Sequence, residues 1–133
     1  MKMGIRYNKK VMEHFMNPKN VGTLEDADTV IEEGNPVCGD MLRMYLKIEE
    51  GKIKDIKFLS FGCAANIATA SVITELAKGR TLEEAKKITM KEVAENLDNL
   101  PRIKMHCAAL AAKALQKAIE EYRESEEAKE DKE

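Results

Sequence analysis

The fold is decided by residues 42–78, which read LRMYLKIEEGKIKDIKFLSFGCAANIATASVITELAK. Apolar and polar residues alternate over residues 42–48, a pattern typical of a strand with one buried face. Glu50-Gly51 then turns the chain into a second run, residues 53–61, which is rich in β-branched and aromatic residues. After Gly62 the apolar period changes from two to about 3.6. We therefore expect a β-hairpin followed by a helix over residues 64–78, with Gly79 capping its end.

Upstream of this stretch the sequence predicts a short helix and a further strand. Tyr7, Val11 and Phe15 recur every four residues, as on one face of a helix. Asn17-Pro18 ends that helix, because the residue before a proline avoids the α region. Residues 29–31 predict a short strand, which completes a small three-stranded antiparallel meander.

Downstream the sequence predicts several helices. Two matches to the capping box indicate short helices, Thr81 with Glu84 and Thr89 with Glu92. A last helix begins near Pro101, a favourable first-turn residue, and its apolar positions run to Tyr122. From Glu124 the apolar residues stop, so we expect a frayed tail over about residues 124–133. The predicted fold is α+β, in which an N-terminal helix and several C-terminal helices pack on a three-stranded sheet, within a single domain of residues 1–133.

Composition excludes several classes of protein. The chain has 22 Lys+Arg against 24 Asp+Glu, a net charge of -2, so it lacks the basic surface of a nucleic-acid binder. No run of about 18 apolar residues exists, and residues 1–10 carry charge without a following apolar stretch, so we expect neither a membrane span nor a secretory signal. The 3 cysteines are an odd number, which argues against a disulfide framework and for a reducing compartment, the cytoplasm.

Each cysteine lies at a predicted element boundary. Cys38 sits in a turn, Cys63 where a strand becomes a helix, and Cys107 directly after His106 near the start of the last helix. A helix N-terminus favours negative charge and lowers the pKa of a thiol. Any one of these cysteines alone would more often be a small buried hydrophobic residue. Three thiols and an imidazole together suit zinc or an iron–sulfur cluster, although without a Cys-x-x-Cys pair the spacing alone does not show that they converge.

Five stretches of the sequence resemble the IscU/NifU N-terminal type of iron–sulfur cluster assembly scaffold. They are YNKKVMEHFMNPKNVG (residues 7–22), CGD (38–40), FGCAA (61–65), LPRIK (100–104) and MHC (105–107). They occur in the family's order, and the resemblance covers about residues 7–122. It implies a scaffold, not an enzyme, on which a cluster is built and from which it passes to acceptor apo-proteins.

The resemblance also implies the site. Cys38, Cys63 and Cys107 ligate the cluster, a [2Fe–2S] cluster in the first instance, and Asp40 and His106 supply or modulate the fourth position. Zinc can take the place of the cluster, since the two share ligands. An imidazole or carboxylate in place of a fourth thiolate leaves an opening for an acceptor's ligand, with His106 as the direct ligand and Asp40 tuning release. The sulfur comes from a cysteine desulfurase.

Two departures from the family pattern limit what carries over. The chaperone-recognition motif usually has a second proline where this chain has Arg102, so binding of an Hsp70-type chaperone does not carry over. The chain lacks the ferredoxin-like and C-terminal cluster-carrying domains of full NifU proteins, so we expect a stand-alone scaffold. Because a cluster can be shared between chains, a homo-oligomer stays open.

Two other functions use the same residues. A zinc-bound sulfurtransferase similar to the SufU type would accept persulfide sulfur on one cysteine. That type carries an insertion between its second and third cysteines and lacks the histidine before the third, and this chain has neither feature. A Cys–His hydrolase is disfavoured, because adjacent His106 and Cys107 on a helix point about 100° apart. We interpret His14 as a packed histidine on its amphipathic helix.

Overall fold

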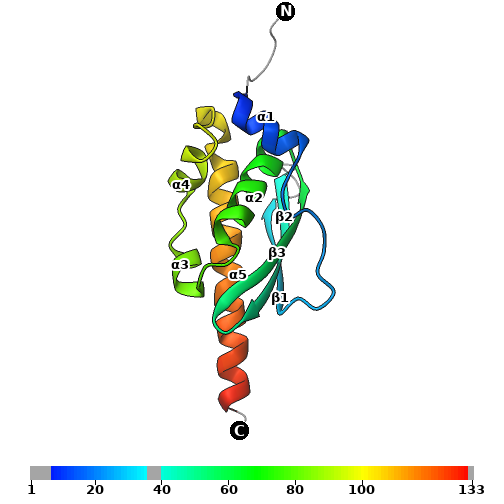
Figure 1. Ribbon diagram of the computed structural model, residues 1–133, viewed down its shortest axis with the longest axis vertical. Helices are drawn as coiled ribbons and strands as arrows, with labels where there is room; N and C mark the ends of the chain where they lie inside the picture. Colours follow the sequence, from blue (N-terminus) through cyan, green and yellow to red (C-terminus); the bar gives the residue numbers. More distant parts are fainter. Residues whose placement is uncertain (1–6, 36–39, 132–133) are drawn as a thin grey trace, which may run out of the picture.

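The computed structural model describes residues 7–35 and 40–131. Its elements along the chain are α1 (Lys9–Met16), β1 (Thr29–Asn35), β2 (Asp40–Glu49), β3 (Lys52–Phe61), α2 (Ala64–Ala77), α3 (Leu82–Lys86), α4 (Met90–Glu95), the 3-10 helix η1 (Arg102–Lys104) and α5 (Met105–Asp131). The helices gather on one side of a three-stranded sheet (Figure 1). The expected α+β fold is confirmed.

The sheet is an antiparallel meander in the order β1-β2-β3, as predicted. Glu50 and Gly51 have positive φ angles of 53° and 74°, which suits a tight two-residue hairpin turn between β2 and β3. The alternation that predicted β2 is also confirmed. The side chains that face the helices, Leu42, Met44, Leu46 and Ile48, are all buried.

Strand β1 is longer than the sequence predicts, since it runs from Thr29 to Asn35 and not only to residue 31. Glu32 lies opposite Arg43 of β2, and the Arg43 Nε–H donates a 2.8 Å hydrogen bond to its carboxylate. Such cross-strand pairs stabilise a sheet. A partner strand therefore extends β1 through glutamates that local propensity does not favour in strands.

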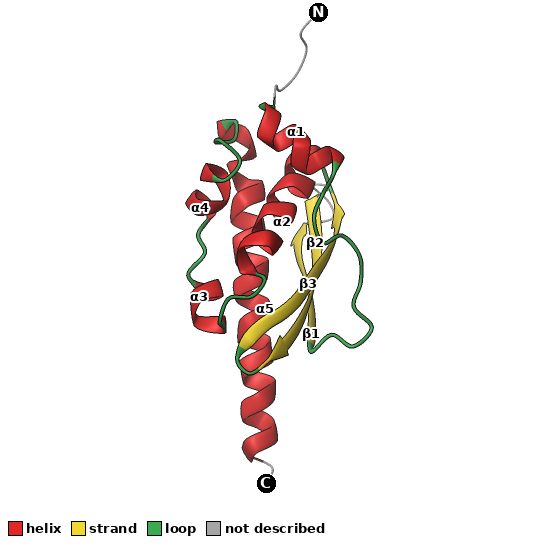
Figure 2. Cartoon of the chain, viewed as in Figure 1, coloured by secondary structure: helices red, strands yellow, loops and turns green. Residues whose placement is uncertain are grey.

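The molecule has three layers, which Figure 2 shows as the sheet, a middle pair of helices and two short outer helices. Helices α2 and α5 cover the sheet and pack against each other, while α3 and α4 pack on the outer side of α5. Helix α1 packs on α2. The largest fully buried side chains come from all of these layers and include Phe58, Ile56, Ile73, Leu97, Leu115 and Ile119.

The starts of α3 and α4 show whether the two predicted capping boxes form. Thr81 and Glu84 form both hydrogen bonds of a capping box at the start of α3, as predicted. At α4 the Thr89 side chain accepts from the Glu92 N–H, but the reciprocal bond is missing. The Glu92 carboxylate pairs with Arg80 instead, at 3.4 Å. A tertiary ion pair has therefore displaced half of the second predicted box.

The last helix differs from its prediction at both ends. Residues 102–104 form a 3-10 turn, and the α-helix begins at Met105 rather than near Pro101. At the other end α5 continues to Asp131 where we expected fraying from Glu124. An ion pair from Arg123 to Glu83 holds this part of α5 to α3. The Glu- and Lys-rich residues beyond it are good helix formers.

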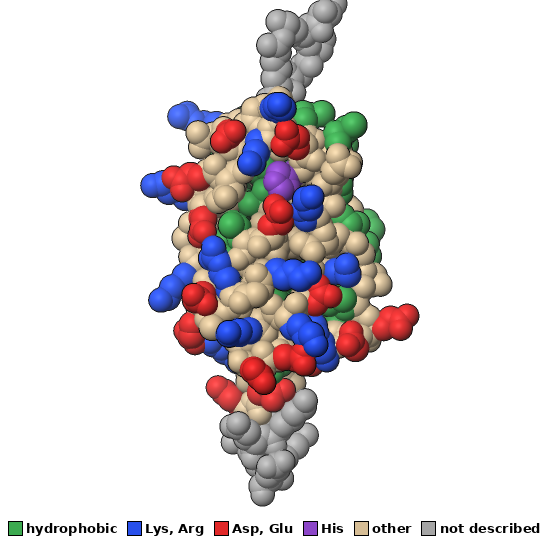
Figure 3. All heavy atoms as spheres, in the orientation of Figure 1, with side chains coloured by type: hydrophobic (Ala, Val, Ile, Leu, Met, Phe, Trp, Pro, Cys, Tyr) green, Lys and Arg blue, Asp and Glu red, His purple; other side chains and the backbone are tan. Residues whose placement is uncertain are grey.

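Charged side chains of both signs intermingle on the face shown in Figure 3. His14 is buried, with its Nδ1 2.8 Å from the Ser71 hydroxyl of α2, so its interpretation as a packed histidine is confirmed. Within residues 7–35 and 40–131, no helix combines the length and the apolar character that crossing a membrane requires.

Gly34 fixes how closely β1 can approach the start of β2. It has a φ of +123°, and a Cβ there would overlap the backbone oxygen of Asp40 and lie 2.8 Å from Met41 Cα. Gly51 also has a positive φ, of +74°, but a Cβ there would meet nothing within 4 Å. The two glycines thus share backbone strain on substitution and differ in the space around them.

We expect Gly34→Ala to lower the free energy of unfolding by about 3 kcal/mol or more, because strain and overlap add. Gly51→Ala should cost only about 1 kcal/mol, from strain alone. Urea unfolding of both variants, followed by far-UV circular dichroism, measures the difference. Equal losses for the two variants would show that the contact with Asp40 and Met41 relaxes freely.

Candidate metal centre

Two cysteine thiols meet where α2 and α5 begin. Cys63 is the N-cap residue of α2 and follows Gly62 at the end of β3, as the sequence predicts. Cys107 is the third residue of α5. Their Sγ atoms lie 3.9 Å apart, and both are free thiols. Residues 44 positions apart in the chain are therefore close enough to share one metal centre.

The environment of Cys107 differs from the prediction. Its side chain is fully buried, and burial, followed by the neighbouring Cys63, raises the pKa of the Cys107 thiol to about 12. The expectation that the helix N-terminus favours a thiolate at this position is wrong for the metal-free protein, because desolvation outweighs the helix dipole. A bound cation reverses that balance, since it stabilises the thiolate directly.

His106 and Asp40 complete the centre on its exposed side. The His106 ring places Nδ1 3.0 Å from the Ile103 carbonyl and Nε2 3.1 Å from Asp40 Oδ2. A carbonyl oxygen only accepts, so Nδ1 carries the proton, and the Nε2 of a neutral ring then has a free lone pair aimed at a carboxylate. Two acceptors that face each other need a cation between them, either a proton or a metal ion.

The Asp40, His106 and Cys107 ligand atoms all lie within 4.8 Å of one another. Nitrogen, oxygen and sulfur donors at this spacing suit zinc or iron. Cys107 Sγ is 3.6 Å from His106 Nε2, so our expectation that the two adjacent side chains point apart is wrong. A hydrolase would need an accessible, ionised nucleophile, and the buried Cys107 thiol with its raised pKa is neither.

Lys104 and Tyr7 are site residues that the sequence analysis did not identify as such. The Lys104 ammonium donates to Cys63 Sγ at 3.5 Å. Although partial burial acts to lower it, the nearby Cys63 and Tyr7 raise the pKa of Lys104, which keeps the ammonium charged. Burial and then Cys63 raise the pKa of Tyr7. Both residues lie in the stretches that carry the family resemblance, and this position in the sequence is the signal by which they could have been identified.

Asn66 was also missed. It is fully buried in the first turn of α2, where its Nδ2 donates to the Met41 carbonyl at 3.2 Å and to the Ser60 hydroxyl at 3.0 Å. It thus ties β2 and β3 to the helix that starts at Cys63. A Cβ at Gly62 would lie 2.5 Å from Asn66 Nδ2 and 2.6 Å from Asp40 Oδ1, so a larger residue there would displace one of these two side chains. The sequence signal that could have identified Asn66 is its position as a polar residue among small and apolar ones.

Cys38, the remaining residue of the expected set, lies outside the described residues, as does Gly39. Asp40, the first residue of β2, follows them directly. Of the five expected ligands, Asp40, His106 and Cys107 place their ligand atoms within 4.8 Å of one another, and Cys63 adjoins this group through the 3.9 Å between its Sγ atom and that of Cys107.

Comparison with known proteins gives a consistent picture. A family model described as the NifU-like N-terminal domain matches residues 6–129. The iron–sulfur cluster assembly scaffold protein IscU 1 of Archaeoglobus fulgidus is 59% identical over 116 residues, which are 87% of this chain and 76% of that protein. The scaffold protein IscU of Escherichia coli is 40% identical over 127 residues, 92% of this chain and 98% of that protein.

Solved structures agree with the fold. A putative iron–sulfur cluster assembly scaffold protein for the SUF system from Fervidobacterium islandicum aligns with a TM-score of 0.71 and 29% identity, over 85% of this chain and 96% of that one. The N-terminal part of a NifU-like protein from Brucella abortus aligns with a TM-score of 0.73 and 22% identity, over 88% and 94%.

The burial of Cys107 predicts a difference in thiol reactivity. With a pKa of about 12, about one Cys107 side chain in ten thousand is a thiolate at pH 8, and the sulfur is also covered. Iodoacetamide should therefore modify the half-buried Cys63 well before Cys107 in the metal-free protein. Peptide mapping by mass spectrometry over a time course measures both rates. Equal rates in folded protein would show that Cys107 is not shielded.

Proposed function

Because the chain belongs to the family of NifU-like N-terminal domains, we propose that it is a scaffold on which an iron–sulfur cluster is assembled and then passed to apo-proteins. One observation above all supports this function. The free lone pair of His106 Nε2 and the Asp40 carboxylate face each other at 3.1 Å beside the Cys107 sulfur, an arrangement that calls for a cation. The relatives that are 40–59% identical carry the name of such a scaffold.

The cluster is the cargo of this protein, and Cys63 and Cys107 provide two of its thiolate ligands. Cys38 provides the third, on the grounds of the family resemblance. His106 supplies the fourth bond through Nε2, which its Nδ1–H···O=C bond to Ile103 leaves unprotonated. Three thiolates and one imidazole hold a cluster less firmly than four thiolates would, which suits a scaffold that must release its product.

Asp40 places a carboxylate directly beside the ring nitrogen that would bind the cluster. Its Oδ2 atom is 3.1 Å from His106 Nε2, and its side chain is only 20% exposed. As a hard, anionic oxygen donor it binds iron less durably than a thiolate does, and it helps to admit water or an incoming ligand. Asp40 therefore promotes release, and this assignment gives a carboxylate beside the site a specific role.

The remaining functional assignments follow from the chemistry of the cargo. A cysteine desulfurase supplies the sulfur, and acceptor apo-proteins receive the cluster, which is of the [2Fe–2S] type. The protein acts as a scaffold and catalyses no turnover of its own. Arg102 interrupts the family's chaperone motif, so an Hsp70-type chaperone is not among the proposed partners. Sharing of one cluster between two copies stays compatible with the exposed His106.

We place the protein in the cytoplasm. The Cys63 and Cys107 sulfurs lie 3.9 Å apart, so an oxidising compartment would link them and remove two ligands at once. A reducing compartment keeps both thiols available.

A zinc-bound sulfurtransferase is the second candidate function. The Asp40, His106 and Cys107 donors would hold zinc as readily as iron. Transfer of persulfide sulfur then requires an accessible thiolate, and the half-buried Cys63 beside Lys104 is the more accessible of the two described cysteines. Whether the protein holds an iron–sulfur cluster or a single zinc ion distinguishes the two candidate functions.

Anaerobic incubation with iron and sulfide should produce a coloured protein that contains iron and acid-labile sulfide in equal amounts. Cys63→Ser and Cys107→Ser should each abolish the visible absorbance, because each removes a thiolate. Elemental analysis and an optical spectrum measure both results. A colourless protein that retains a single tightly bound zinc per chain would instead favour the sulfurtransferase.

We expect Asp40→Ala to hold its cluster several-fold longer in air and to activate an acceptor apo-protein more slowly. The reason is that the site then loses the hard oxygen donor beside His106 Nε2 that helps to admit an incoming ligand. Decay of visible absorbance, with and without acceptor, measures both rates. Glu95→Ala, which removes an exposed carboxylate on α4, is the matched control and should behave as the wild type. Faster decay in Asp40→Ala would show that Asp40 retains the cluster.

A further inference from the structure

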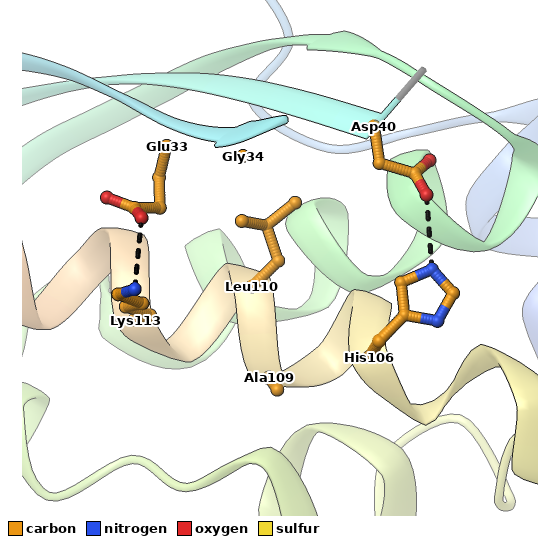
Figure 4. A pocket seen from close by; sticks show the side chains of 7 residues that line it. All are labelled: Glu33, Gly34, Asp40, His106, Ala109, Leu110 and Lys113. Carbon is orange, nitrogen blue, oxygen red and sulfur yellow. Dashed lines mark hydrogen bonds and ion pairs between the residues drawn. The ribbon is translucent and has the colours of Figure 1, made fainter. Parts of the chain in front are cut away.

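A groove leads from the metal centre along α5. It is a cavity of about 500 Å³ between α5 and the adjoining ends of β1 and β2. Figure 4 shows Asp40 and His106 at one end of the groove, Leu110 in its middle, and Glu33 with Lys113 at the other end. Gly34 and Ala109 complete its lining. The groove therefore joins the nitrogen and oxygen donors of the metal centre to a pair of charges through an apolar middle.

A second cavity continues the groove along the same helix. It has a volume of about 360 Å³ and shares Glu33 and Lys113 with the first. His106, Leu110 and Lys113 recur at three- and four-residue intervals, so they lie on one face of α5. Seven residues separate His106 from Lys113, which corresponds to about 10 Å along the helix axis. The two cavities together thus follow one face of α5, a path that suits an extended chain.

The far end of the groove carries a surplus positive charge, since two carboxylates meet three ammonium groups there: Glu33 pairs with Lys113 and Lys117, and Glu120, which lines the second cavity, lies 3.8 Å from Lys86. Glu33 Oε1 lies 3.3 Å from Lys113 Nζ, and Glu33 Oε2 lies 3.2 Å from Lys117 Nζ. Although burial acts to raise it, hydrogen bonds from Lys117 and Lys113 hold the pKa of Glu33 below its usual value, so one carboxylate faces two ammonium groups. The Lys113 side chain is 69% exposed and thus free to meet a second carboxylate.

We propose that this groove receives an extended, cysteine-bearing segment of an acceptor apo-protein, whose thiol reaches the Asp40–His106 end while an acidic residue three positions away pairs with Lys113 and Lys117. An extended chain spans about 3.3 Å per residue, so three residues cover the distance of about 10 Å. The inference rests on the proposed scaffold function and names the chemistry by which this scaffold recognises the protein that takes its cluster.

The position of the groove favours an acceptor over a sulfur donor. It opens on the nitrogen and oxygen donors, whose bonds to iron are weaker than those of the thiolates and are replaced first. The acceptor thiolate forms an Fe–S bond as the Fe–Nε2 bond breaks, the thiol proton passes to water, and no electron is transferred. A sulfur donor must reach a cysteine sulfur instead. Of the two described cysteines, Cys107 is fully buried, and the half-buried Cys63 does not line the groove.

Peptide binding to the metal-free protein tests the groove without any cluster. The probes are acetylated, amidated tetrapeptides, Asp-Gly-Gly-Cys and Cys-Gly-Gly-Asp, and the same pair with Lys in place of Asp. NMR titration should shift the amide signals of Ala109 and Leu110, and an acidic peptide should bind about fivefold more tightly than its basic counterpart. Equal binding of acidic and basic peptides, or shifts elsewhere only, would overturn the proposal.

Charge reversal supplies the matched test. Lys113→Glu changes the summed charge of Glu33, Glu120, Lys86, Lys117 and residue 113 from +1 to -1, so the basic peptide should now bind more tightly than the acidic one. Lys91→Glu, an exposed lysine of α4 outside the groove, is the control and should leave the order unchanged. Ala109→Phe fills the groove and should remove binding of both peptides. An unchanged preference in Lys113→Glu would contradict the charge assignment.

Cluster transfer then identifies the occupant. Lys113→Glu, loaded with its cluster, should deliver the cluster more slowly to an acceptor with an acidic cysteine segment, and faster to a variant acceptor in which that acid is Lys. If the variant instead slows only cluster build-up from desulfurase-supplied sulfur, the groove receives the sulfur donor and our choice of occupant is wrong. A protein that forms a cluster but binds no peptide would refute the groove while leaving the scaffold function standing.

Discussion

The close packing of α2 against α5 is the contact on which the rest of the structure depends. Half of the buried positions of the two helices are alanines, among them Ala65, Ala68, Ala108 and Ala111. Small side chains let two helices approach closely, because the distance between helix axes follows the size of the residues in the contact. The two helix starts therefore meet, with Cys63 on one and Cys107 on the other. The sheet adds Asp40 from the start of β2, and Asn66 fastens that strand to α2.

The same packing places the thiols in an environment that a cation would stabilise. In the metal-free protein Cys107 is buried with a pKa of about 12, Lys104 donates to Cys63, and His106 faces Asp40 with acceptor atoms on both sides. Burial disfavours the thiolate, a metal favours it, and the free energy of metal binding has to exceed that desolvation cost. Because the desolvation cost offsets part of the metal-binding free energy, the site binds its cluster reversibly, and transfer to an acceptor requires such reversibility.

Much of the fold could be predicted from the sequence because its signals are local. Alternation identified β2, and Thr81 with Glu84 capped α3. The predicted Gly79 cap of α2 is not formed, because Lys78 is already extended and the Gly79 N–H donates to the Ile53 carbonyl of β3. The errors arose where distant residues decide the outcome. Arg80 takes the Glu92 carboxylate from its predicted cap, and Arg43 extends β1 through Glu32.

The site also combines features that local sequence signals indicate with features that only tertiary packing decides. Its residue types and their positions at element boundaries were readable from the sequence, but the burial of Cys107 and the contact of Lys104 with Cys63 were not. Both depend on how α2, η1 and α5 pack. The groove between β1 and α5 is likewise a tertiary feature, since Glu33 and Lys113 are far apart in the chain.

The central claim is that Cys63 and Cys107, together with a nitrogen or oxygen donor on the Asp40–His106 side, hold one iron–sulfur cluster. Mössbauer spectroscopy of protein loaded anaerobically with iron-57 and sulfide tests it most directly, because it distinguishes iron sites by their ligands. We predict two kinds of iron site in one cluster, one bound by sulfur alone and one that also has a nitrogen or oxygen ligand. A single symmetric all-sulfur environment, or isolated iron ions without sulfide, would contradict the account.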